Sequence, residues 1–532
     1  MTEVVANLQA LRNVDTTVMF GNELCFVKGH TFDGDGGGGL FMWSTMPPYY
    51  GTGTYAIDNN GTVIKTQSTT QDKGRWVRQY DGHINVLYFG AFGKTQDYTV
   101  AFQNAIDFAW MNAQNDPEMK GSVVYIPNGS YRINTLILKS GISIIGENID
   151  RTVLQTTVNH TADYMLKTQT GPTFLNMENI TLYGRNETNA GGMLLKDGIW
   201  NSSFKNIKIF NFGGHGLFLD TVQDSPLPNQ FNTFENIRIS KMNDFSHCLK
   251  ITGQTGQTTF INCNFDGYKS GTPSRFPKGH NVNISHTGST TTAILSFINC
   301  SFQEGDYGIY LNYVENVNID TCWFENVGVS ITLNGTEYNS CRDITVQNCR
   351  FANASGYGSL VVSPDNIKGG QCISVANSFV NVYNNYVVVS DPNSPNLSKD
   401  SSFIFAENNR NGGIAISDNV FQDNKLGLTH GIVQTIHFSS GALECARHKF
   451  VRVNYYPTAI FYIDSSISAT ETITIKAVGS ISFNNLGNIN LLGKSTLALN
   501  AGDVVVFMKA DVPTGLYLDT FQLISVLRAA QV

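Results

Sequence analysis

The chain has 532 residues, of which 41% are hydrophobic and 14% charged, and its formal net charge is −7. This length predicts more than one domain, and the mild negative charge argues against nucleic acid as a main partner. No stretch of about 18 apolar residues occurs, so we expect no membrane span. The N-terminus also lacks the basic and apolar regions of a secretory signal.

Residues 1–84 are expected to form a separate β-rich domain. Residues 33–39, DGDGGGG, form a flexible turn that leads into a strand, and Asn59-Asn60-Gly61 forms a tight turn before another. The glycine-rich run is followed by neither a GK[ST] motif nor a helix, so we interpret it as a turn and not as a phosphate-binding loop.

One helix is predicted with an apolar face, over residues 99–114. Phe102, Ile106 and Ala109 recur there at helical spacing, and Asp97 or Thr99 can cap its N-terminus. The helix has no charged stripe. We therefore expect it to cap the core of the next domain and not to bind a partner.

From residue 135 onward, short strands follow one another without helical periodicity, and a phrase Asn-x-x-apolar recurs every 22–37 residues. A repeat of this period is typical of a solenoid, and the strands predict a right-handed parallel β-helix over residues 85–440. Its turns would stack about 4.8 Å apart, so that equivalent side chains form columns and the Asn amides bond along the stack. The repeat positions are Asn179, Asn206, Asn236, Asn262, Asn299, Thr321 and Asn348.

Seven of the nine cysteines lie between Cys248 and Cys372, at the spacing of this repeat. No CxxC pair occurs, so a zinc site is not expected. We interpret the cysteines as buried, reduced thiols that act as small hydrophobic residues.

After about residue 440 the repeat ends, and residues 441–532 read as alternating strands bounded by glycines. This pattern predicts a compact β-sandwich. An open solenoid end needs a cover, so we expect this domain to serve trimerisation or glycan binding.

Four carboxylates that follow the repeat phrase are the predicted catalytic residues. Asp266 and Glu325 would face outward two turns apart, with backbones about 9.6 Å from each other at about 4.8 Å per turn. Neighbouring carboxylates repel, which favours one protonated acid beside one ionised base, as glycoside hydrolysis requires. We expect an inverting mechanism, with Glu304 or Glu325 as the acid and Asp306 or Asp266 as the base.

Aromatic and basic side chains accompany these carboxylates. Flat rings stack on sugar faces, and the basic residues of an insertion at 269–292 would suit an acidic sugar, although Trp323 is equally suited to packing within the repeat. No dense Asp cluster of the calcium-binding kind occurs, and neither a metal nor a cofactor is expected. The predicted substrate-binding residues are Tyr268, Arg275, His280, Tyr307, Tyr310, Trp323 and Arg350.

A succession of motifs over residues 30–146 resembles the bacteriophage tailspike depolymerases that have a pectate-lyase-like β-helix. The motifs are DGGGGLFMW, NNGTVIK, GRWVRQYDG, INVLYFGAFG, AFQNAI and VVYIPNGSYRI. The resemblance implies a homotrimer in the virion tail that acts at the host cell surface. It also implies that the N-terminal part faces the virion and binds another tail or baseplate protein. The family does not define catalytic positions by a motif, so none is carried over.

These observations favour endo-glycosidic hydrolysis of a bacterial capsule, exopolysaccharide or O-antigen. A polysaccharide lyase remains open, with Lys269, Arg275, His280, Tyr307 or Arg350 as the base or the group that neutralises a uronate. A receptor-binding adhesin without catalysis also remains open. A deacetylase is less favoured, because no G-x-S-x-G motif occurs.

Overall fold

The structure is a computed structural model in which both compact units, Met1–Ser246 and His247–Val532, contain turns of a right-handed parallel β-helix. The predicted all-β fold is therefore confirmed. Among the residues that the structure describes, no helix is long and apolar enough to cross a membrane. The described residues are 3–45, 57–67, 74–93, 96–115, 122–158, 160–187, 190–222, 225–241, 246–267, 280–286, 292–305, 307–325, 327, 329–335, 339–352, 371–376, 378–388, 402–407, 413–417, 420–421, 433–436, 438–439, 442–446, 450–453, 462–465, 471–477, 480–485, 489–510 and 521–529.

The first unit begins with a five-stranded sheet in the order β1-β2-β3-β5-β4. The sheet packs on a short helix, α1 (Leu8–Arg12), which the sequence did not predict. Trp43 and Trp76 meet edge to face in this core, with ring centroids 5.5 Å apart. The strands are β1 (Glu3–Val5), β2 (Leu24–Val27), β3 (Gly39–Ser44), β4 (Val63–Ile64) and β5 (Arg75–Gln79).

The glycine-rich run is a turn, as predicted, and it surrounds a buried cation. Arg78 donates to the carbonyl oxygens of Gly37, Gly38 and Gly61, and burial lowers the pKa of its guanidinium to about 10. A Cβ on Gly38 would lie 2.6 Å from the carbonyl oxygen of Lys28. A Cβ on Gly39 would lie 2.7 Å from Nη1 of Arg78, so glycine at these positions lets the backbone approach the buried guanidinium.

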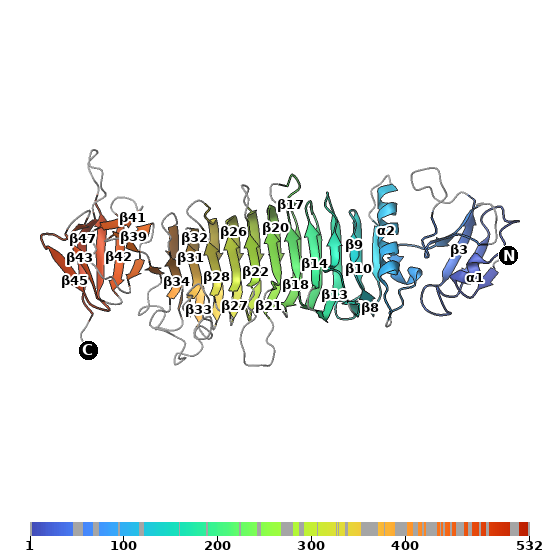
Figure 1. Ribbon diagram of the computed structural model, residues 1–532, viewed down its shortest axis with the longest axis horizontal. Coiled ribbons are helices and arrows are strands. Elements are labelled where there is room, and N and C mark those ends of the chain that lie inside the picture. The colour runs from blue at the N-terminus through green and yellow to red at the C-terminus, as the bar shows by residue number, and fades with distance from the viewer. Residues whose placement is uncertain are drawn as a thin grey trace. The chain divides into compact units, whose positions relative to one another are not determined.

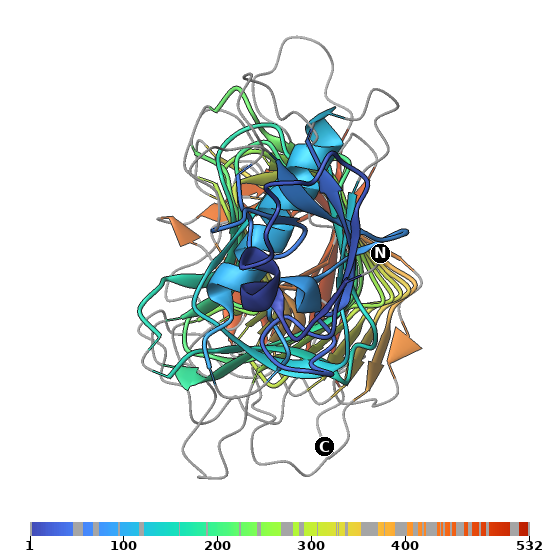
Figure 2. The same ribbon diagram turned by 90° about the vertical axis from the view of Figure 1, so that its right-hand side faces the viewer.

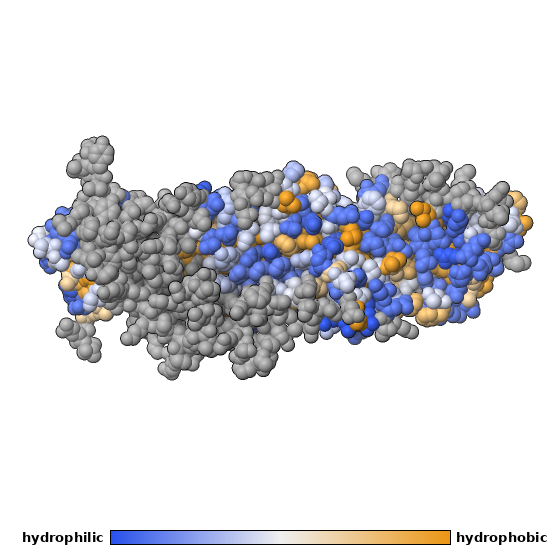
Figure 3. Space-filling view, in the orientation of Figure 1, coloured by the Kyte–Doolittle hydropathy of each residue, from blue (hydrophilic) through white to orange (hydrophobic). Residues whose placement is uncertain are grey.

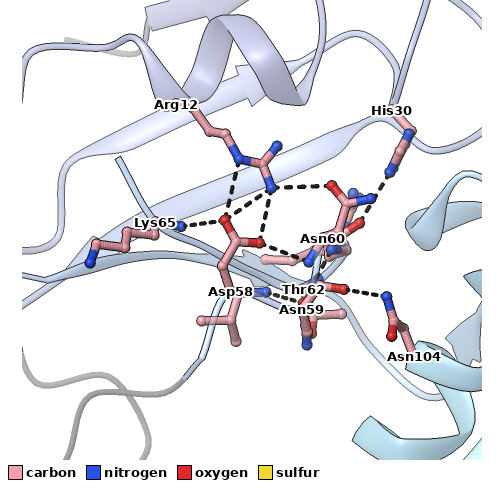
Figure 4. A network of polar contacts seen from close by, with 11 residues as sticks. Arg12, His30, Asp58, Asn59, Asn60, Thr62, Lys65 and Asn104 are labelled. Atoms are coloured by element: carbon pink, nitrogen blue, oxygen red, sulfur yellow. Dashed lines mark hydrogen bonds and ion pairs between the residues drawn. The ribbon is translucent and has the colours of Figure 1, made fainter. Parts of the chain in front are cut away.

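A polar network joins four segments of the first unit (Figure 4). Arg12 and Asp58 form a bidentate ion pair, with both carboxylate oxygens 2.9 Å from Nη2. His30 contacts the carbonyl oxygen of Asn60 through Nε2 at 3.1 Å, and Asn104 donates to that of Asn59 at 3.3 Å. Asn104 belongs to the helix α2 (Thr99–Asn115), so the network holds the N-terminal sheet against this helix.

Asp58→Ala should destabilise the first unit by about 2 kcal/mol, because Arg12 would lose a charge-assisted partner. Chemical denaturation followed by tryptophan fluorescence would measure this, since Trp43 and Trp76 lie in the adjacent core. Lys28→Ala removes only an exposed ion pair with Asp33 and serves as the control. Equal stability of the two variants would contradict this assignment.

Helix α2 begins where predicted and ends one residue later. The Oδ1 atom of Asp97 accepts a hydrogen bond from the backbone N–H of Thr99 at 2.8 Å, which caps the N-terminus. The helix buries Phe102, Ile106 and Ala109 and contacts β7 (Ser122–Ile126), β9 (Leu136–Leu138) and β10 (Ile142–Gly146). It thus covers the end of the first turns (Figures 1 and 2).

Parallel strands of the first unit stack behind α2, with register shifts near the ends of β13 and β15. Phe204 and Phe234 form a buried stack between two turns, with centroids 4.8 Å apart. The remaining elements are β6 (Ile84–Asn85), a 3-10 helix (Val86–Phe89), β8 (Gly129–Ile133), β11 (Thr152–Thr156), β12 (Tyr164–Thr168), β13 (Leu175–Glu187), β14 (Gly191–Lys196), β15 (Ser203–Phe212), β16 (Leu217–Asp220), β17 (Asn229–Gln230) and β18 (Thr233–Lys241).

The second unit continues with the same architecture in two strand sets. One set holds β20 (Thr255–Ile261), β21 (Asn264–Gly267), β23 (Thr292–Ile298), β24 (Ser301–Gln303), β26 (Val314–Asp320), β27 (Trp323–Glu325), β29 (Arg342–Gln347), β30 (Arg350–Ala352), β32 (Phe379–Tyr383), β33 (Tyr386–Val388), β35 (Gly413–Ser417) and β36 (Val420–Phe421). The other holds β19 (Leu249–Thr252), β22 (His280–Ser285), β25 (Tyr307–Asn312), β28 (Val329–Asn334), β31 (Gln371–Ala376), β34 (Ser402–Glu407) and β37 (Val433–Ile436).

Columns of equivalent side chains fill the interior of these turns, as predicted. Phe302 stacks on Phe324 and Phe324 on Phe351, with centroids 4.8 Å and 5.0 Å apart. The cysteines whose side chains the structure describes are buried, in agreement with their interpretation as small hydrophobic residues; they are Cys25, Cys248, Cys263, Cys300, Cys322, Cys341 and Cys349. Burial raises the pKa of the Cys322 and Cys341 thiols, so both stay protonated at neutral pH.

The asparagine column follows the corners of the turns, where it is half-buried at Asn179, Asn206 and Asn236 and exposed at Asn262, Asn299 and Asn348. The amides do bond along the stack: Asn299 donates to Asn262 at 2.7 Å and Asn384 to Asn348 at 2.5 Å. Each of these residues has φ between 52° and 55°, the left-handed region that asparagine tolerates better than most residues. Backbone conformation therefore explains the choice of asparagine.

Asn299→Gly should therefore cost less than Asn299→Val. Glycine adopts the left-handed conformation freely and loses only the amide hydrogen bond, about 1 kcal/mol. Valine also strains the backbone by a further 1–2 kcal/mol or so. Urea unfolding midpoints of the two variants would rank them, and a more stable valine variant would show that the conformation is not what selects asparagine.

The C-terminal strands form a five-stranded sheet, β40-β42-β46-β47-β44, together with a two-stranded and a three-stranded sheet. The apolar faces enclose a core that includes Ile475, Phe483 and Phe507. The proposed boundaries at residues 84 and 440 remain predictions. The strands are β38 (Phe438–Ser439), β39 (Ala442–Ala446), β40 (Phe450–Val453), β41 (Tyr462–Ser465), β42 (Thr472–Ala477), β43 (Ile481–Asn484), β44 (Ile489–Asn490), β45 (Thr496–Leu499), β46 (Val504–Lys509) and β47 (Phe521–Leu527).

Candidate functional site

Four adjacent strands of the second unit align the predicted carboxylate column. Strand pairing places Asp266 of β21 opposite Gln303 of β24, Gln303 opposite Glu325 of β27, and Glu325 opposite Ala352 of β30. In each of the first three strands, the preceding phenylalanine is buried while the column residue is partly exposed. The repeat therefore predicted the register and the outward direction of this column.

Glu325 is held in place by two hydrogen bonds. Its Oε2 atom accepts from Gln303 Nε2 at 2.9 Å and from Trp323 Nε1 at 3.3 Å. Gln303 in turn accepts from Asn264 Nδ2 at 3.4 Å. Three successive turns are thus linked by side chains on one outward face, which restricts the rotamer of Glu325.

Glu304 lies at a strained corner immediately after β24. Its φ is 55°, a left-handed conformation that costs a non-glycine residue roughly 1–2 kcal/mol, and its backbone N–H donates to the carbonyl oxygen of Glu325 at 3.3 Å. Gly305, the next residue of this bend, is not in the left-handed conformation, so Glu304 itself carries the strain of the turn.

Two glycines allow this corner to close. A Cβ on Gly267 would lie 1.7 Å from the carbonyl oxygen of Glu304, and a Cβ on Gly305 would lie 2.3 Å from Oδ1 of Asn281. Asn281 also donates to the carbonyl oxygen of Gln303 at 2.8 Å, so it joins β22 to the end of β24. The carboxylates at the ends of β21 and β24 therefore lie at the corner where β22 and β25 begin.

Aromatic rings line that corner on the second strand set. His280 stacks between His247 and Tyr310, with centroids 4.9 Å and 4.7 Å away and interplanar angles of 20° and 19°. Tyr307 lies 4.8 Å from His280 at 57°. Asn283 Nδ2 is also 2.8 Å from His280 Nδ1, a contact that holds the His280 ring in place. The rings form a continuous ladder across β22 and β25.

His247 is the ring that the sequence reasoning missed. Leu249 of β19 pairs with Val282 of β22, so that His247 corresponds to His280 in the turn that follows. Aligning the apolar residues of this second strand set would have found it. The repeat phrase lies in the other set and does not reach this position.

Trp323 and Arg350 form the second outward column of the site. The two residues pair across β27 and β30, and the guanidinium carbon lies 4.7 Å from the centroid of the tryptophan ring. Trp323 also donates to Glu325. The sequence assigned Trp323 either to packing or to sugar binding. In the structure it contacts both the guanidinium of Arg350 and the carboxylate of Glu325.

Trp323→Phe should lower turnover about tenfold if Glu325 takes part in catalysis, because phenylalanine keeps a ring but removes a hydrogen bond to a charged group. In the glycosidic hydrolysis that the sequence predicts, the rate of reducing-end release would measure it. Arg350→Ala, which leaves the Trp323 N–H in place, is the matched control. A smaller loss for Trp323→Phe than for Arg350→Ala would indicate that the ring and its cation matter and that the hydrogen bond does not.

Four of the candidate site residues, Tyr268, Lys269, Arg275 and Asp306, lie outside the described residues. The described ones form two contact groups, the ring ladder with His280 and the set of Glu325, Trp323 and Arg350, and their catalytic and binding roles remain predictions. Within the described part of the chain, no group of three or more His, Cys, Asp or Glu side chains has the arrangement of a metal site.

Two family models match parts of the sequence. The phage tail protein small four-stranded beta-sheet domain matches residues 4–81, and the family of rhamnogalacturonase A/epimerase, pectate lyase-like, matches residues 83–189. No curated protein matches the sequence.

Solved phage tailspikes share the fold over the length of the chain. The gp42 tailspike of Acinetobacter phage vb_AbaP_AS12 is 12% identical, with 100% of this chain and 94% of that chain covered and a TM-score of 0.55. Tailspike gp49 of Acinetobacter baumannii bacteriophage Fri1, a capsular polysaccharide depolymerase, is 14% identical over 98% and 92%, with a TM-score of 0.52. The enzymatically active domain of tailspike protein 2 of bacteriophage CBA120 is 13% identical over 98% and 79%, also with a TM-score of 0.52. The predicted resemblance to β-helical tailspikes is confirmed in the fold.

Proposed function

We propose that the chain is a phage tailspike that depolymerises a bacterial surface polysaccharide by endo-glycosidic hydrolysis. The observation that carries this proposal is the corner in which Glu304, Glu325 and Asp266 lie beside a ladder of aromatic rings. The fold shared with tailspikes, one of them described as a capsular polysaccharide depolymerase, supports it. On the face seen in Figure 3, hydrophilic residues cover much of the coloured surface.

In the proposed reaction, one carboxyl group protonates the leaving glycosidic oxygen while a carboxylate takes a proton from the attacking water. We assign the acid to Glu304, since Oε2 of Glu325 already accepts two N–H donors, and the base to Asp266. Asp266 and Glu304 extend from adjacent strands. The backbones of neighbouring strands lie about 4.8 Å apart, and the two side chains can diverge from there. Inversion requires about 6.5–9.5 Å between the carboxyl groups, which the corner at Glu304 permits.

The ring ladder would bind the sugar chain. Tyr307 and Tyr310 are partly exposed, and their rings together with that of His280 offer flat apolar faces next to the carboxylates. Sugar rings present C–H faces that pack on such surfaces, while their hydroxyl groups bond to neighbouring polar atoms. Trp323 extends this surface along the first strand set.

Incubation of the full chain with purified host capsules tests the proposal. We expect new reducing ends without the ultraviolet absorbance of an unsaturated uronate, since hydrolysis adds water and creates no double bond. Appearance of that absorbance would instead establish β-elimination. Binding without any cleavage would leave a receptor-binding protein.

A lyase is the second candidate, because the rings of His280 and Tyr307 lie 4.8 Å apart. A histidine and a tyrosine so placed can share proton abstraction and leaving-group protonation. Arg350, held over Trp323, would then neutralise a uronate carboxylate. Tyr307→Phe separates the two candidates: a lyase loses most of its activity, whereas the hydrolase keeps its turnover and binds its substrate more weakly.

We further propose that the chain works as a homotrimer in the phage tail, with the N-terminal sheet bound to another tail protein. The match of residues 4–81 to a phage tail domain supports this location. Light scattering should give three times the mass of one chain, which is 58.4 kDa. A single-chain mass at micromolar concentration would refute the trimer.

A further inference from the structure

The first unit carries a second aromatic surface, on the outer side of its turns. Tyr183 of β13 pairs with Phe210 of β15, and their rings stack with centroids 4.9 Å apart at 25°. Both rings are partly exposed, unlike the buried stack of Phe204 and Phe234 between two turns of the same unit. Interior stacking explains the buried pair. It does not explain why an outward column contains two adjacent aromatic residues.

The guanidinium group of Arg185 reaches the strand next to this ring pair. Gln155 of β11 pairs with Tyr183, and its Oε1 accepts from Nη1 of Arg185 at 3.2 Å. Gln155 Nε2 in turn donates to Ser130 at 2.8 Å, which orients the amide toward the arginine. Arg185 therefore reaches back over β11, beside the ring of Tyr183, and donates there to a neutral group.

The backbone is distorted at the positions that create this arrangement. Register shifts follow Tyr183 in β13 and Phe210 in β15, and both Arg185 and Asn211 adopt left-handed conformations, with φ of 55° and 61°. A Cβ on Gly184 would lie 2.3 Å from the carbonyl oxygen of Asn211, so only glycine fits between the two bulges. Bulges redirect side chains and often accompany binding sites. Here they turn Arg185 toward Gln155.

We infer that Tyr183, Phe210 and Arg185 form a binding subsite for an acidic sugar residue, such as a hexuronate, of the polysaccharide. The paired rings match the apolar face of one sugar ring. The planar guanidinium binds a carboxylate through two parallel hydrogen bonds. Lys208 lies in the neighbouring outward column, and its positive charge is compensated by an ion pair with Asp150. The inference rests on the proposed function, because it assumes that the chain binds a glycan.

Saturation-transfer NMR on the full chain tests the subsite, with methyl glucuronide and methyl galacturonide as probes and methyl glucoside as the neutral comparison. The protein carries Glu304→Gln so that no turnover interferes. We expect at least one uronide to bind more tightly than the glucoside. Tyr183→Ala and Phe210→Ala should each weaken this binding about threefold to tenfold. Arg185→Gln should reduce the uronide to the affinity of the glucoside.

Two substitutions in the same unit are matched controls. Lys205→Gln removes an outward cation paired with Glu235, and Phe231→Ala removes an aromatic side chain that is 53% exposed. Both should leave uronide binding unchanged. Absence of uronide binding, or equal binding by the test and control variants, would overturn the subsite.

The depolymerisation assay separates the two proposals. If wild-type protein cleaves the capsule but the Tyr183, Phe210 and Arg185 variants bind uronides normally, the subsite is wrong and the proposed function stands. If uronide binding depends on these residues but no capsule is cleaved, the subsite stands and the hydrolase proposal fails.

Discussion

Glu304→Gln should lower the turnover of polysaccharide by about 10²–10⁴-fold, the usual contribution of general acid–base catalysis, while the protein remains folded. The glutamine side chain is nearly the same size as that of glutamate. The substitution leaves in place the backbone N–H that donates to the carbonyl oxygen of Glu325. It removes the proton that the leaving oxygen would receive. The rate of reducing-end release at saturating capsule concentration measures the effect.

The strained backbone of Glu304 provides the control. Asparagine tolerates the left-handed conformation better than glutamate, so Glu304→Asn should be as stable as the wild type or more stable by up to about 1 kcal/mol. It should nonetheless be as inactive as Glu304→Gln. A residue kept for structure alone would show the opposite pattern, with loss of stability and normal turnover. Such a result would remove Glu304 from the proposed mechanism.

Gly267→Ala should lower turnover about 100-fold, because a Cβ at this position would lie 1.7 Å from the carbonyl oxygen of Glu304 and must displace it. A shift of about 1 Å in a catalytic group is sufficient for such a loss. Overpacking should also destabilise the second unit by about 1–3 kcal/mol. Turnover should be measured at a temperature where circular dichroism shows the variant to be folded.

Gly82→Ala is the matched control for Gly267→Ala. Gly82 has a left-handed φ of 77°, but no atom lies within 4 Å of the position of its Cβ. The control should therefore show backbone strain of about 1–2 kcal/mol with normal turnover. If Gly267→Ala also retains full activity in its folded form, the position of Glu304 is not critical and the acid lies elsewhere.

The sequence alone determined the architecture, because a parallel β-helix repeats the same environment at every turn. Phe265, Phe302 and Phe324 occur at equivalent positions since each must stack on the next, and the spacing of the phrase reveals the turns directly. The outward column of Asp266, Gln303 and Glu325 followed from the same register. The extent of helix α2 was predictable too, because its apolar period and its cap are local features.

The corners required the tertiary structure. The positions of side chains there depend on contacts between segments that the sequence repeat does not relate. An example is the hydrogen bond from Asn281 to the carbonyl oxygen of Gln303. The strain at Glu304 and the close approach of Gly267 to its carbonyl oxygen lie in this contact region, and the repeat predicted neither. His247 was missed because the asparagine phrase belongs to the other strand set. Sequence periodicity thus defined which residues face outward, and only the packing of neighbouring turns decided which of them meet.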